Sequence, residues 1–373
     1  MKKILFVSHE GSITGAPLFL VKLVRYLKIE RPEYIIAIFF SKTGELVELL
    51  KKDGFDIFVS EKYVQSNSKT FKLLNRIKHY FFYIKVLVSF RPNLVYSNTI
   101  VNFGEVFLAK LFKASVLLHI HEGKNFCRTF RRRLMISCLL TNRIIVGSHY
   151  VNSALNSLTK RLGYVVHNGV NLPTKIPVKH KLSGIPFKIG ILGTIDLNKG
   201  QLVAMEALRL LVGRGLSTKL HVAGRVVDEG YYAQLCNHIR ENTLEEFVEF
   251  VGIVPDATVF LNSLDLLVVP SFDEAFPTVI LEAFSTGTLV VASDVGGIPE
   301  IIQNEVNGLL VKAGDSMMLA EAIEKIIMDD SLLQRLPLSA LKTLQEKFDV
   351  CTTNRLLTIH LDEILLGKSQ QDG

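Results

Sequence analysis

Residues 266–293 read "LLVVPSFDEAFPTVILEAFSTGTLVVAS" and combine three local patterns. The two valine-rich apolar runs, 266–269 and 289–293, are typical of strands buried on both faces. The segment between them follows a proline and ends at Gly287, so it predicts a helix with Thr278 as its N-cap and the glycine as its stop. A strand, a helix and a second strand in this order predict a parallel β-α-β unit.

The same alternation of apolar runs and helical stretches continues along the whole chain. Further strand candidates are the runs 2–8, 34–40, 56–60, 93–97, 115–121, 143–148, 163–169, 188–194, 220–224, 248–252 and 308–311. Strands of this kind, separated by helices, predict parallel sheets with helices on both faces. We therefore predict an α/β protein with two doubly wound, Rossmann-like domains facing across a cleft.

Proline and lysine are concentrated in residues 173–187, which have no hydrophobic periodicity and predict a linker. The linker separates an N-terminal domain, 1–172, from a C-terminal domain, 188–350. We expect a last helix, within 351–373, to cross back to the N-terminal domain.

Composition narrows the class of protein. The 373 residues are 48% hydrophobic, which is enough to build two cores. The four cysteines lack the paired spacing of a metal site or a disulfide framework, so a reducing cytoplasm is expected. The apolar run at the start of the chain is too short for a signal peptide, and none reaches the ~18 residues of a membrane span.

Charge is divided unequally between the two halves. Residues 1–175 contain 27 Lys and Arg against 10 Asp and Glu, whereas the remainder contains 16 against 26. Halves of opposite sign indicate two domains with different partners.

Two glutamates stand out in the first stretch, because Glu282 lies in the otherwise apolar run 279–284. An unpaired buried charge costs several kcal/mol, so such a carboxylate suggests a ligand. The start of the predicted helix can bind an anion, and carboxylates beside it suit neutral hydroxyls, as a nucleotide sugar offers. Alternatively, Glu274 is a solvated turn residue, and Glu282 is a first-turn acid stabilised by ~0.3–1 kcal/mol.

A longer pattern makes the interpretation specific. The stretch "SFDEAFPTVILEAFSTGTLVVASDVGGIPEII", followed by "NGLLV" at 307–311, resembles the nucleotide-sugar signature of retaining glycosyltransferases of family 4 (glycosyl transferases group 1), which have the GT-B fold. The residues that fall on the family pattern are Glu274, Glu282, Ala283, Gly287, Gly296, Gly297, Pro299, Glu300, Asn307 and Gly308. The resemblance implies that Glu282 holds a ribose and that Glu274 contacts the transferred sugar. It also implies that Phe276, Pro277 and Thr278 line the pocket.

The segment "GILGTIDLNKGQ", 190–201, resembles the family element that supplies an Arg and a Lys to the diphosphate. Lys199 matches the lysine, but Thr194 stands where many members have arginine. Arg225 either supplies the second cation or is a solvated loop residue. The similarity of "FVGIV" to the segment that reads the nucleobase implies a contact at Ile253.

In the first domain, "SHEGSITGAPLFLVKLVRYL" resembles the family's glycine-rich turn and first helix, where Gly15 would let the backbone approach phosphate or sugar. The spacing is not Gly-x-Gly-x-x-Gly, which argues against a dinucleotide dehydrogenase. In "LLHIHEG", His121 matches the histidine that bonds the transferred sugar, although a histidine beside a strand is often structural. We expect His119 to be structural.

A basic surface is predicted in the first domain, because no acidic residue occurs between Lys62 and Gly104. Basic residues among apolar ones favour an anionic membrane surface as partner. Nucleic acid and plain solvation are the alternatives, and no nucleic-acid motif is present. The residues assigned to this membrane or acceptor surface are Lys69, Lys72, Arg76, Lys124, Arg128, Arg131, Arg132 and Arg133.

The sequence thus predicts a retaining glycosyltransferase that moves a sugar from a nucleotide-diphosphate sugar to a hydroxyl of a glycan or lipid-linked acceptor in cell-surface polysaccharide synthesis. Glu274, Lys199 and His121 are the predicted catalytic residues. We expect no cofactor and no metal, and a location at the inner face of the membrane. A nucleotide-sugar epimerase of the same fold and a non-catalytic subunit are the alternatives.

Overall fold

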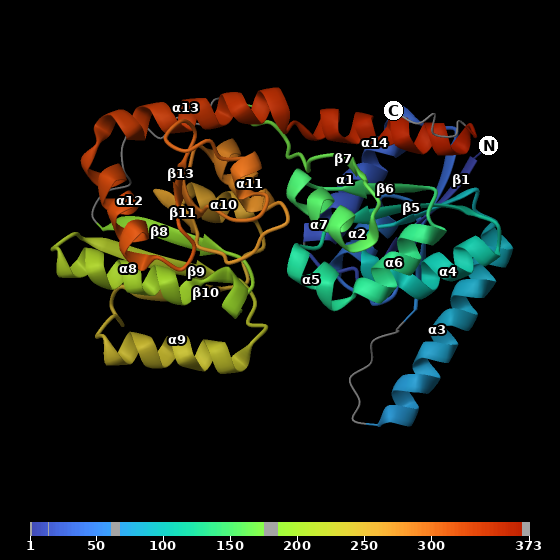
Figure 1. Ribbon diagram of the computed structural model, residues 1–373, viewed down its shortest axis with the longest axis horizontal. Helices are drawn as coiled ribbons and strands as arrows, with labels where there is room; N and C mark the ends of the chain where they lie inside the picture. The colour runs from blue at the N-terminus through green and yellow to red at the C-terminus, as the bar shows by residue number, and fades with distance from the viewer. Residues whose placement is uncertain (1, 14, 61–67, 175–185, 368–373) are drawn as a thin grey trace. The chain divides into compact units, whose positions relative to one another are not determined.

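The computed structural model describes residues 2–13, 15–60, 68–174 and 186–367. It divides the chain into two compact units (Figure 1). Unit 1 comprises Met1–Asn168 and Val350–Gly373, and unit 2 comprises Gly169–Asp349. Most of the predicted linker, 175–185, lies outside the described residues.

Unit 1 contains a parallel sheet with the strand order β3-β2-β1-β4-β5-β6-β7. Its strands are β1 Lys2–Ser8, β2 Tyr34–Phe40, β3 Asp56–Val59, β4 Leu94–Ser97, β5 Ser115–Ile120, β6 Arg143–Val146 and β7 Tyr164–Val165. Ile4 of β1 is paired with Ile36 of β2 on one side and with Leu94 of β4 on the other. The run 163–169 forms only a two-residue strand, because the chain leaves the sheet after Val166 and the His167 carbonyl accepts a hydrogen bond from Thr353.

Helices cover both faces of this sheet. They are α1 Gly15–Glu30, α2 Glu45–Lys52, α3 Lys69–Phe90, α4 Phe103–Leu111, α5 Lys124–Thr129, α6 Arg131–Leu140, α7 His149–Thr159 and α14 Val350–Leu365, with a 3₁₀ turn, η1, at Ile100–Asn102. Side chains of β1 alternate between the two cores: Ile4 and Phe6 pack with α1, and Leu5 and Val7 pack with α3 and α4. Continuous burial of the strand therefore follows from helices on both sides.

The last helix, α14, packs against α1 in unit 1. Leu357, Leu361 and Leu365 belong to the same core as α1. Asp362 accepts a hydrogen bond of 2.9 Å from Arg31, and Glu363 pairs with Arg143. The end of the chain is thus built into the unit formed by its beginning.

Unit 2 has a six-stranded parallel sheet with the order β10-β9-β8-β11-β12-β13. The strands are β8 Phe187–Leu192, β9 Thr218–Ala223, β10 Val248–Gly252, β11 Leu266–Val269, β12 Leu289–Ser293 and β13 Leu309–Val311. The helices are α8 Gln201–Gly213, α9 Glu229–Glu241, α10 Ala257–Asn262, α11 Thr278–Thr286, α12 Ser316–Met328 and α13 Asp330–Lys347, with 3₁₀ turns η2 Leu197–Lys199 and η3 Ile298–Glu300.

Both units are doubly wound. In each sheet the first strand lies in the middle, and the order reverses beside it, between β1 and β4 and between β8 and β11. One core of unit 2 gathers α8 and α12, and the other gathers α10, α11 and α13. The predicted α/β fold with two Rossmann-like domains is confirmed.

Two further observations concern the cysteines and the lengths of the helices. Within the described residues, which include all four cysteines, no disulfide is formed. Across the described ranges, every helix is too short or too polar to cross a lipid bilayer.

Candidate functional site

The reversal of strand order in unit 2 creates a place for a ligand. β8 and β11 are hydrogen-bonded neighbours, but the chain leaves them in different directions, toward α8 and toward α11. Ligands of open parallel sheets bind beyond the carboxyl ends of the strands at such a point. The segment after β8 carries Lys199, and the segment after β11 carries Glu274.

Lys199 and Glu274 meet at this edge. The Lys199 Nζ atom lies 2.6 Å from Oε1 of Glu274, which also accepts a hydrogen bond of 2.8 Å from Ser271 Oγ. The side chain of Glu274 is 11% exposed and that of Lys199 is 29% exposed. Two residues predicted to be catalytic are therefore held together and are partly shielded from water.

Glycines let the loops approach each other here. Gly200 has φ of +67°, and a Cβ atom on it would lie 2.0 Å from the Pro270 carbonyl oxygen. Gly296 has φ of +59°, and a Cβ atom there would lie 2.0 Å from the Glu274 carbonyl oxygen. That oxygen accepts a hydrogen bond of 2.9 Å from Gly297 N. Larger residues would push Lys199 and Glu274 apart, which explains the glycines at these two positions.

Helix α11 begins one residue earlier than predicted. Thr278 is its first residue, not its N-cap; Pro277 occupies the cap and makes no side-chain cap bond. Pro277 has extended backbone angles, with φ of −75° and ψ of 101°, and its side chain has no group that could cap the helix. The prediction of Gly287 as the stop is confirmed, with φ of +68° at the C-cap.

The burial of α11 explains the carboxylate in its apolar run. Ile280, Leu281, Ala283 and Phe284 are buried in the core, whereas Glu282 is half-buried at the side of the helix. Its carbonyl accepts hydrogen bonds from Ser285 and Thr286. Glu282 is thus positioned at the border of the core, on the helix that follows the Glu274 loop.

The loop after β8 carries Thr194 at the position where the family pattern has an arginine. Thr194 donates a hydrogen bond of 2.6 Å to Asp196, which also accepts one from Asn198 N. Arg225 is exposed on the loop after β9, and its carbonyl accepts a bond of 2.9 Å from Ile195 N. The backbone therefore places Arg225 beside the threonine loop, at the same edge of the sheet as Lys199.

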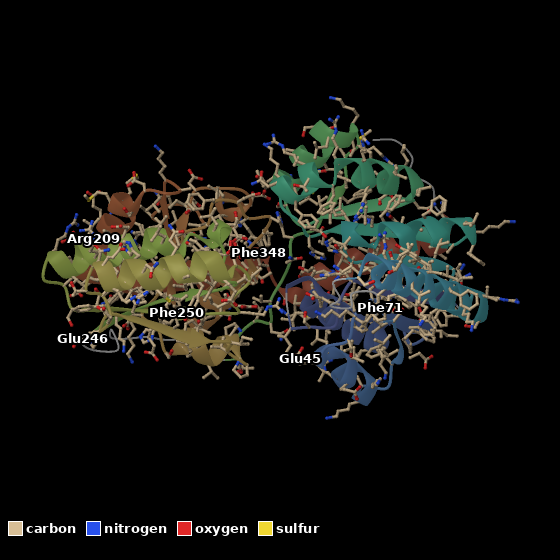
Figure 2. All side chains as sticks on the ribbon, turned by 90° about the horizontal axis from the view of Figure 1, so that it is seen from below. Glu45, Phe71, Arg209, Glu246, Phe250 and Phe348 are labelled. Carbon is tan, nitrogen blue, oxygen red and sulfur yellow. The ribbon has the colours of Figure 1, made fainter. Side chains whose placement is uncertain are left out.

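Three further predicted donor residues have different surroundings. Ile253 directly follows β10 and is 72% exposed, so it is accessible to a ligand. Pro277 is buried at the start of α11. Phe276 is a core residue, with its ring centroid 5.7 Å from that of Phe348, which is labelled in Figure 2. The Phe276 side chain thus packs in the core, and its part in lining the donor pocket stays a prediction.

In unit 1, His121 follows the end of β5. Its Nε2 atom lies 3.0 Å from Oδ1 of Asn98, whose amide nitrogen donates to the Ala16 carbonyl at 2.7 Å. An oxygen facing the ring requires a proton on Nε2, which leaves the Nδ1 lone pair as an acceptor. Burial lowers the pKa of His121 to about 3, with His9 contributing, so the imidazole is neutral at physiological pH.

His119 is structural, as expected. It is fully buried, its Nδ1 atom lies 2.5 Å from the Tyr96 hydroxyl, and its ring centroid lies 3.9 Å from that of His121. Burial and the neighbouring His121 hold its pKa well below the usual value. The stacked ring supports the position of His121.

Glu122 is a residue that the sequence interpretation missed. Its carboxylate accepts hydrogen bonds from Thr99 Oγ1, Ile100 N and His121 N, so it joins the loops after β4 and β5. Burial raises the pKa of this carboxyl group. The signal was present in the sequence, because an acid directly follows the histidine that the family pattern singles out.

Gly15 is the first residue of α1. Among the described residues, no heavy atom lies within 4 Å of the position that its Cβ would take, apart from its chain neighbours and its own helix. The space beside it is open, so a ligand could approach this backbone.

The predicted basic surface is exposed on the helices of unit 1. Lys72, Arg76, Arg128, Arg131, Arg132 and Arg133 are exposed, and Lys124 is half-buried. The side chain of Lys69 lies outside the described residues.

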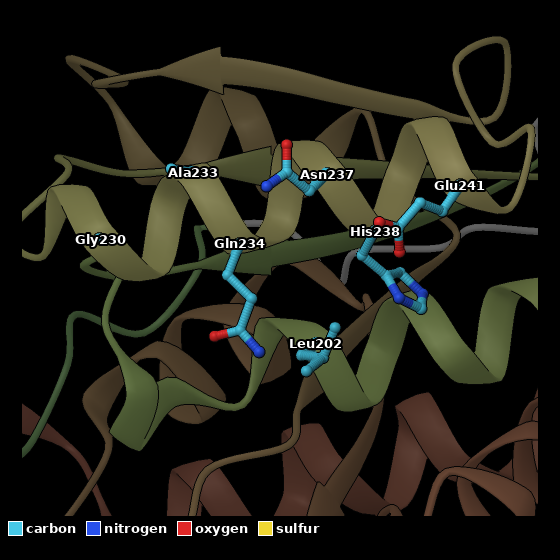
Figure 3. Close-up of a pocket in the computed structure, with 7 residues that line it drawn as sticks. All are labelled: Leu202, Gly230, Ala233, Gln234, Asn237, His238 and Glu241. Carbon is cyan, nitrogen blue, oxygen red and sulfur yellow. The ribbon is translucent and has the colours of Figure 1, made fainter.

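A separate pocket of about 420 Å³ lies between α8 and α9 (Figure 3). It is lined by Leu202, Gly230, Ala233, Gln234, Asn237, His238 and Glu241. None of these residues was predicted to bind the donor, and the pocket has no part in the site at the sheet edge.

Comparison with known proteins decides the family. Residues 174–342 match the family model described as Glycosyl transferases group 1. These residues belong to the glycosyl transferases group 1 family. They contain Lys199, Glu274 and Glu282, so the family assignment rests on the part of the chain that forms the proposed donor site.

Curated relatives match over longer stretches. The chain is 30% identical over 251 residues to the capsular polysaccharide biosynthesis glycosyltransferase CapM of Staphylococcus aureus, which covers 64% of this chain and 63% of CapM. It is 28% identical over 187 residues to the amylovoran biosynthesis glycosyltransferase AmsK of Erwinia amylovora, covering 48% of this chain and 45% of AmsK. The aligned part is thus less than two thirds of either relative.

Solved structures show the same fold over almost the whole chain. The Anabaena protein HepE in complex with UDP has a TM-score of 0.80 at 23% identity, covering 97% of this chain and all of HepE. The complex of HepE with UDP-glucose has a TM-score of 0.82 at 22% identity, with the same coverage. The GT-B fold predicted for this chain is therefore confirmed.

Proposed function

We propose that this chain is a retaining glycosyltransferase that moves a sugar from a nucleotide-diphosphate sugar to a hydroxyl of a glycan or lipid-linked acceptor in cell-surface polysaccharide synthesis. The observation that carries the proposal is the Lys199–Glu274 pair, 2.6 Å apart at the switch point of unit 2. CapM and AmsK, which are polysaccharide biosynthesis glycosyltransferases, support the class of reaction. HepE, which binds UDP and UDP-glucose, supports a nucleotide-sugar donor.

The proposed chemistry is mainly electrostatic. When the bond between sugar and diphosphate breaks, negative charge grows on the leaving phosphate, and Lys199 together with the first-turn N–H groups of α11 stabilises it. Glu274 accepts hydrogen bonds from sugar hydroxyls, and Glu282 holds the ribose. Neutral His121 offers Nδ1 as an acceptor to a sugar hydroxyl.

We propose that no metal or other cofactor takes part, because the lysine and the helix start supply positive charge to the diphosphate. Turnover should then be unchanged after treatment with EDTA. A loss that Mg²⁺ or Mn²⁺ restores would contradict this part of the proposal.

Release of nucleoside diphosphate tests the transferase. A panel of nucleotide sugars is first screened for thermal stabilisation, because a ligand that binds only the folded state raises the melting temperature. The stabilising donor is then incubated with candidate acceptors, and free nucleotide is measured. The matched control is Lys219→Ala, since Lys219 also pairs with a glutamate in unit 2, at 3.3 Å from Glu249, but away from the site.

The two alternative functions, an epimerase and a non-catalytic subunit, predict different results in these experiments. An epimerase would isomerise the donor sugar without an acceptor, which NMR of the sugar would show. A non-catalytic subunit would be stabilised by a donor and release no nucleotide. The replacement of arginine by Thr194 is the feature that favours the latter, and nucleotide release would exclude it.

We further propose that the protein works in the cytoplasm, at the inner face of the membrane, through its basic surface. Anionic vesicles should bind it, and binding should fall with salt, because exposed charges are screened over ~8–10 Å at 0.1–0.15 M. The exposed Arg131, Arg132 and Arg133 should each contribute ~1 kcal/mol near such a surface. Replacing all three with serine should weaken binding, and binding unaffected by salt would contradict the contact.

A further inference from the structure

Helix α3 carries two apolar stripes on opposite sides. Tyr83, Val86, Leu87 and Phe90 are buried in the core between α3 and the sheet. Leu74, Ile77, Phe81 and Val88 form a second stripe, and these side chains are 48%, 58%, 58% and 52% exposed. At 100° per residue, the second stripe points away from the core. We call these four residues the outer stripe.

The outer stripe is unusual for a surface helix, whose solvent side is normally polar. Its members are three, four and seven positions apart, so they lie in one row along the helix. In Figure 1 the first turns of α3 extend away from the sheet of unit 1. Phe71 in these turns, labelled in Figure 2, is 45% exposed, and Leu73 is 58% exposed.

The charge around the stripe has one sign. Residues 62–170 contain seventeen Lys and Arg but two acids, Glu105 and Glu122. Glu105 is buried, and its Oε1 atom lies 2.6 Å from Nε2 of His79. The carboxylate of Glu122 accepts a hydrogen bond from Thr99 within the same unit. The helix itself has no Asp or Glu, and the Lys85 Nζ atom lies 4.8 Å from the ring centroid of Phe81. The segment that carries the apolar row therefore has a large excess of positive charge.

Two further helices near α3 also carry exposed apolar side chains. Helix α4 contacts both α3 and α6. Exposed apolar side chains on α4 and α6 are Phe107, Leu111, Met135, Ile136 and Leu139. All three helices thus carry exposed apolar groups, and α6 also carries the exposed Arg131, Arg132 and Arg133.

An exposed apolar helix face can be covered by a second copy of the chain or by a lipid bilayer. The positive charge of this segment decides between these two partners. A second copy of α3 would bring two basic helices together, and their repulsion would oppose pairing. An anionic bilayer satisfies both features, since apolar side chains enter the acyl boundary and Lys and Arg meet lipid phosphates. We propose that α3 inserts its outer stripe into an anionic phospholipid bilayer. The inference rests on the membrane contact proposed above, but not on sugar transfer.

Insertion can be followed by fluorescence, because the chain has no tryptophan. Phe81→Trp places a single tryptophan in the outer stripe. Its emission should shift to the blue with vesicles of phosphatidylcholine and phosphatidylglycerol, and brominated acyl chains should quench it. The control is Ile359→Trp on α14, where Ile359 is 46% exposed, and it should do neither. No shift at position 81 in bound protein would overturn the inference.

A second variant distinguishes insertion of the apolar stripe from the electrostatic attraction between basic residues and anionic lipid. Leu74→Ser, Ile77→Ser and Phe81→Ser together should lower the vesicle partition coefficient about tenfold or more, because each large apolar side chain contributes roughly that factor when fully buried. The control pair Leu356→Ser and Ile359→Ser on α14 should bind like the wild type. Melting curves check that each variant folds.

The outcomes distinguish the proposals. If the triple serine variant binds vesicles like the wild type, the stripe does not insert, although the basic contact stands. If the wild-type protein does not bind anionic vesicles, both membrane proposals are wrong. A wild-type dimer in solution that the triple variant converts to a monomer would assign the stripe to a second copy. Nucleotide release is measured separately, so failure of the transferase leaves these readouts intact.

Discussion

The Nζ atom of Lys199 lies 2.6 Å from Oε1 of Glu274, although 75 positions separate the two residues along the chain. They meet because β8 and β11 are neighbours in the sheet and the segments after both strands end at the same edge. A ligand at this edge meets a cation and a carboxylate together. This pair is the centre of the predictions below.

Replacing the cation should slow the reaction. Lys199→Ala should lower turnover by ~10–1000-fold, the range for loss of one electrostatic stabiliser of the transition state. It also leaves Glu274 without its lysine, so the melting temperature is measured in parallel. Lys219→Ala should keep wild-type turnover. If both variants turn over at the wild-type rate, Lys199 has no role in stabilising the leaving diphosphate.

Glu282 should matter for binding of the nucleotide. Glu282→Ala should weaken nucleotide affinity and leave the fold intact, because the side chain is half-buried at the border of the core. Calorimetric titration with the nucleoside diphosphate measures the affinity. Glu241→Ala, on α9 beside the separate pocket, is the control. Wild-type affinity of Glu282→Ala would remove this residue from the ribose role.

Arg225 should replace the arginine missing at Thr194. Arg225→Ala should then lower turnover by ~10–1000-fold. The effects of Arg225→Ala and Lys199→Ala should not multiply in the double variant, since both act on one charge. Thr194→Arg should give little gain. Unchanged turnover of Arg225→Ala would mean that Lys199 and backbone N–H groups alone stabilise the diphosphate.

The neutral His121 makes stability depend on pH in a defined direction. Its pKa is about 3 in the folded protein, against an ordinary value of 6.5. Between these values the unfolded chain binds a proton that the folded protein does not, so the free energy of unfolding falls as the pH falls from 6.5 toward 3. His121→Gln should lose less stability over this range in denaturant titrations. His119 acts in the same direction, and its contribution also becomes smaller in the variant, because His121 is one cause of its lowered pKa.

Gly200 should be required for the position of Lys199. Gly200→Ala would bring a Cβ atom 2.0 Å from the Pro270 carbonyl oxygen at φ of +67°, so the loop must shift. We expect a loss of ~1–3 kcal/mol in the free energy of unfolding and reduced turnover. Gly213→Ala at the other end of α8 has nothing within 4 Å and should be neutral or stabilising. Equal stability of the two variants would contradict the close approach.

The fold of this protein could largely be predicted from its sequence. Valine-rich runs such as 289–293 are buried on both faces, and only a parallel sheet covered by helices buries them in that way. The start of α11 was misplaced by one residue, because proline and threonine both suit a helix start and local preference does not separate them. The burial of Phe276 was not predicted for a related reason, because a position next to Glu274 does not show which side chain turns toward the core.

The sequence by itself determined the fold class, the family pattern around Glu274 and Glu282, and the positive charge of residues 62–170, because periodicity, spacing and composition are local properties. Tertiary structure alone decided that Lys199 pairs with Glu274, that Glu122 ties two loops to His121, and that the outer stripe of α3 is exposed. These relationships depend on strand order and on which helix face meets a sheet. They join residues far apart in the chain, and the pattern of either segment alone does not contain them.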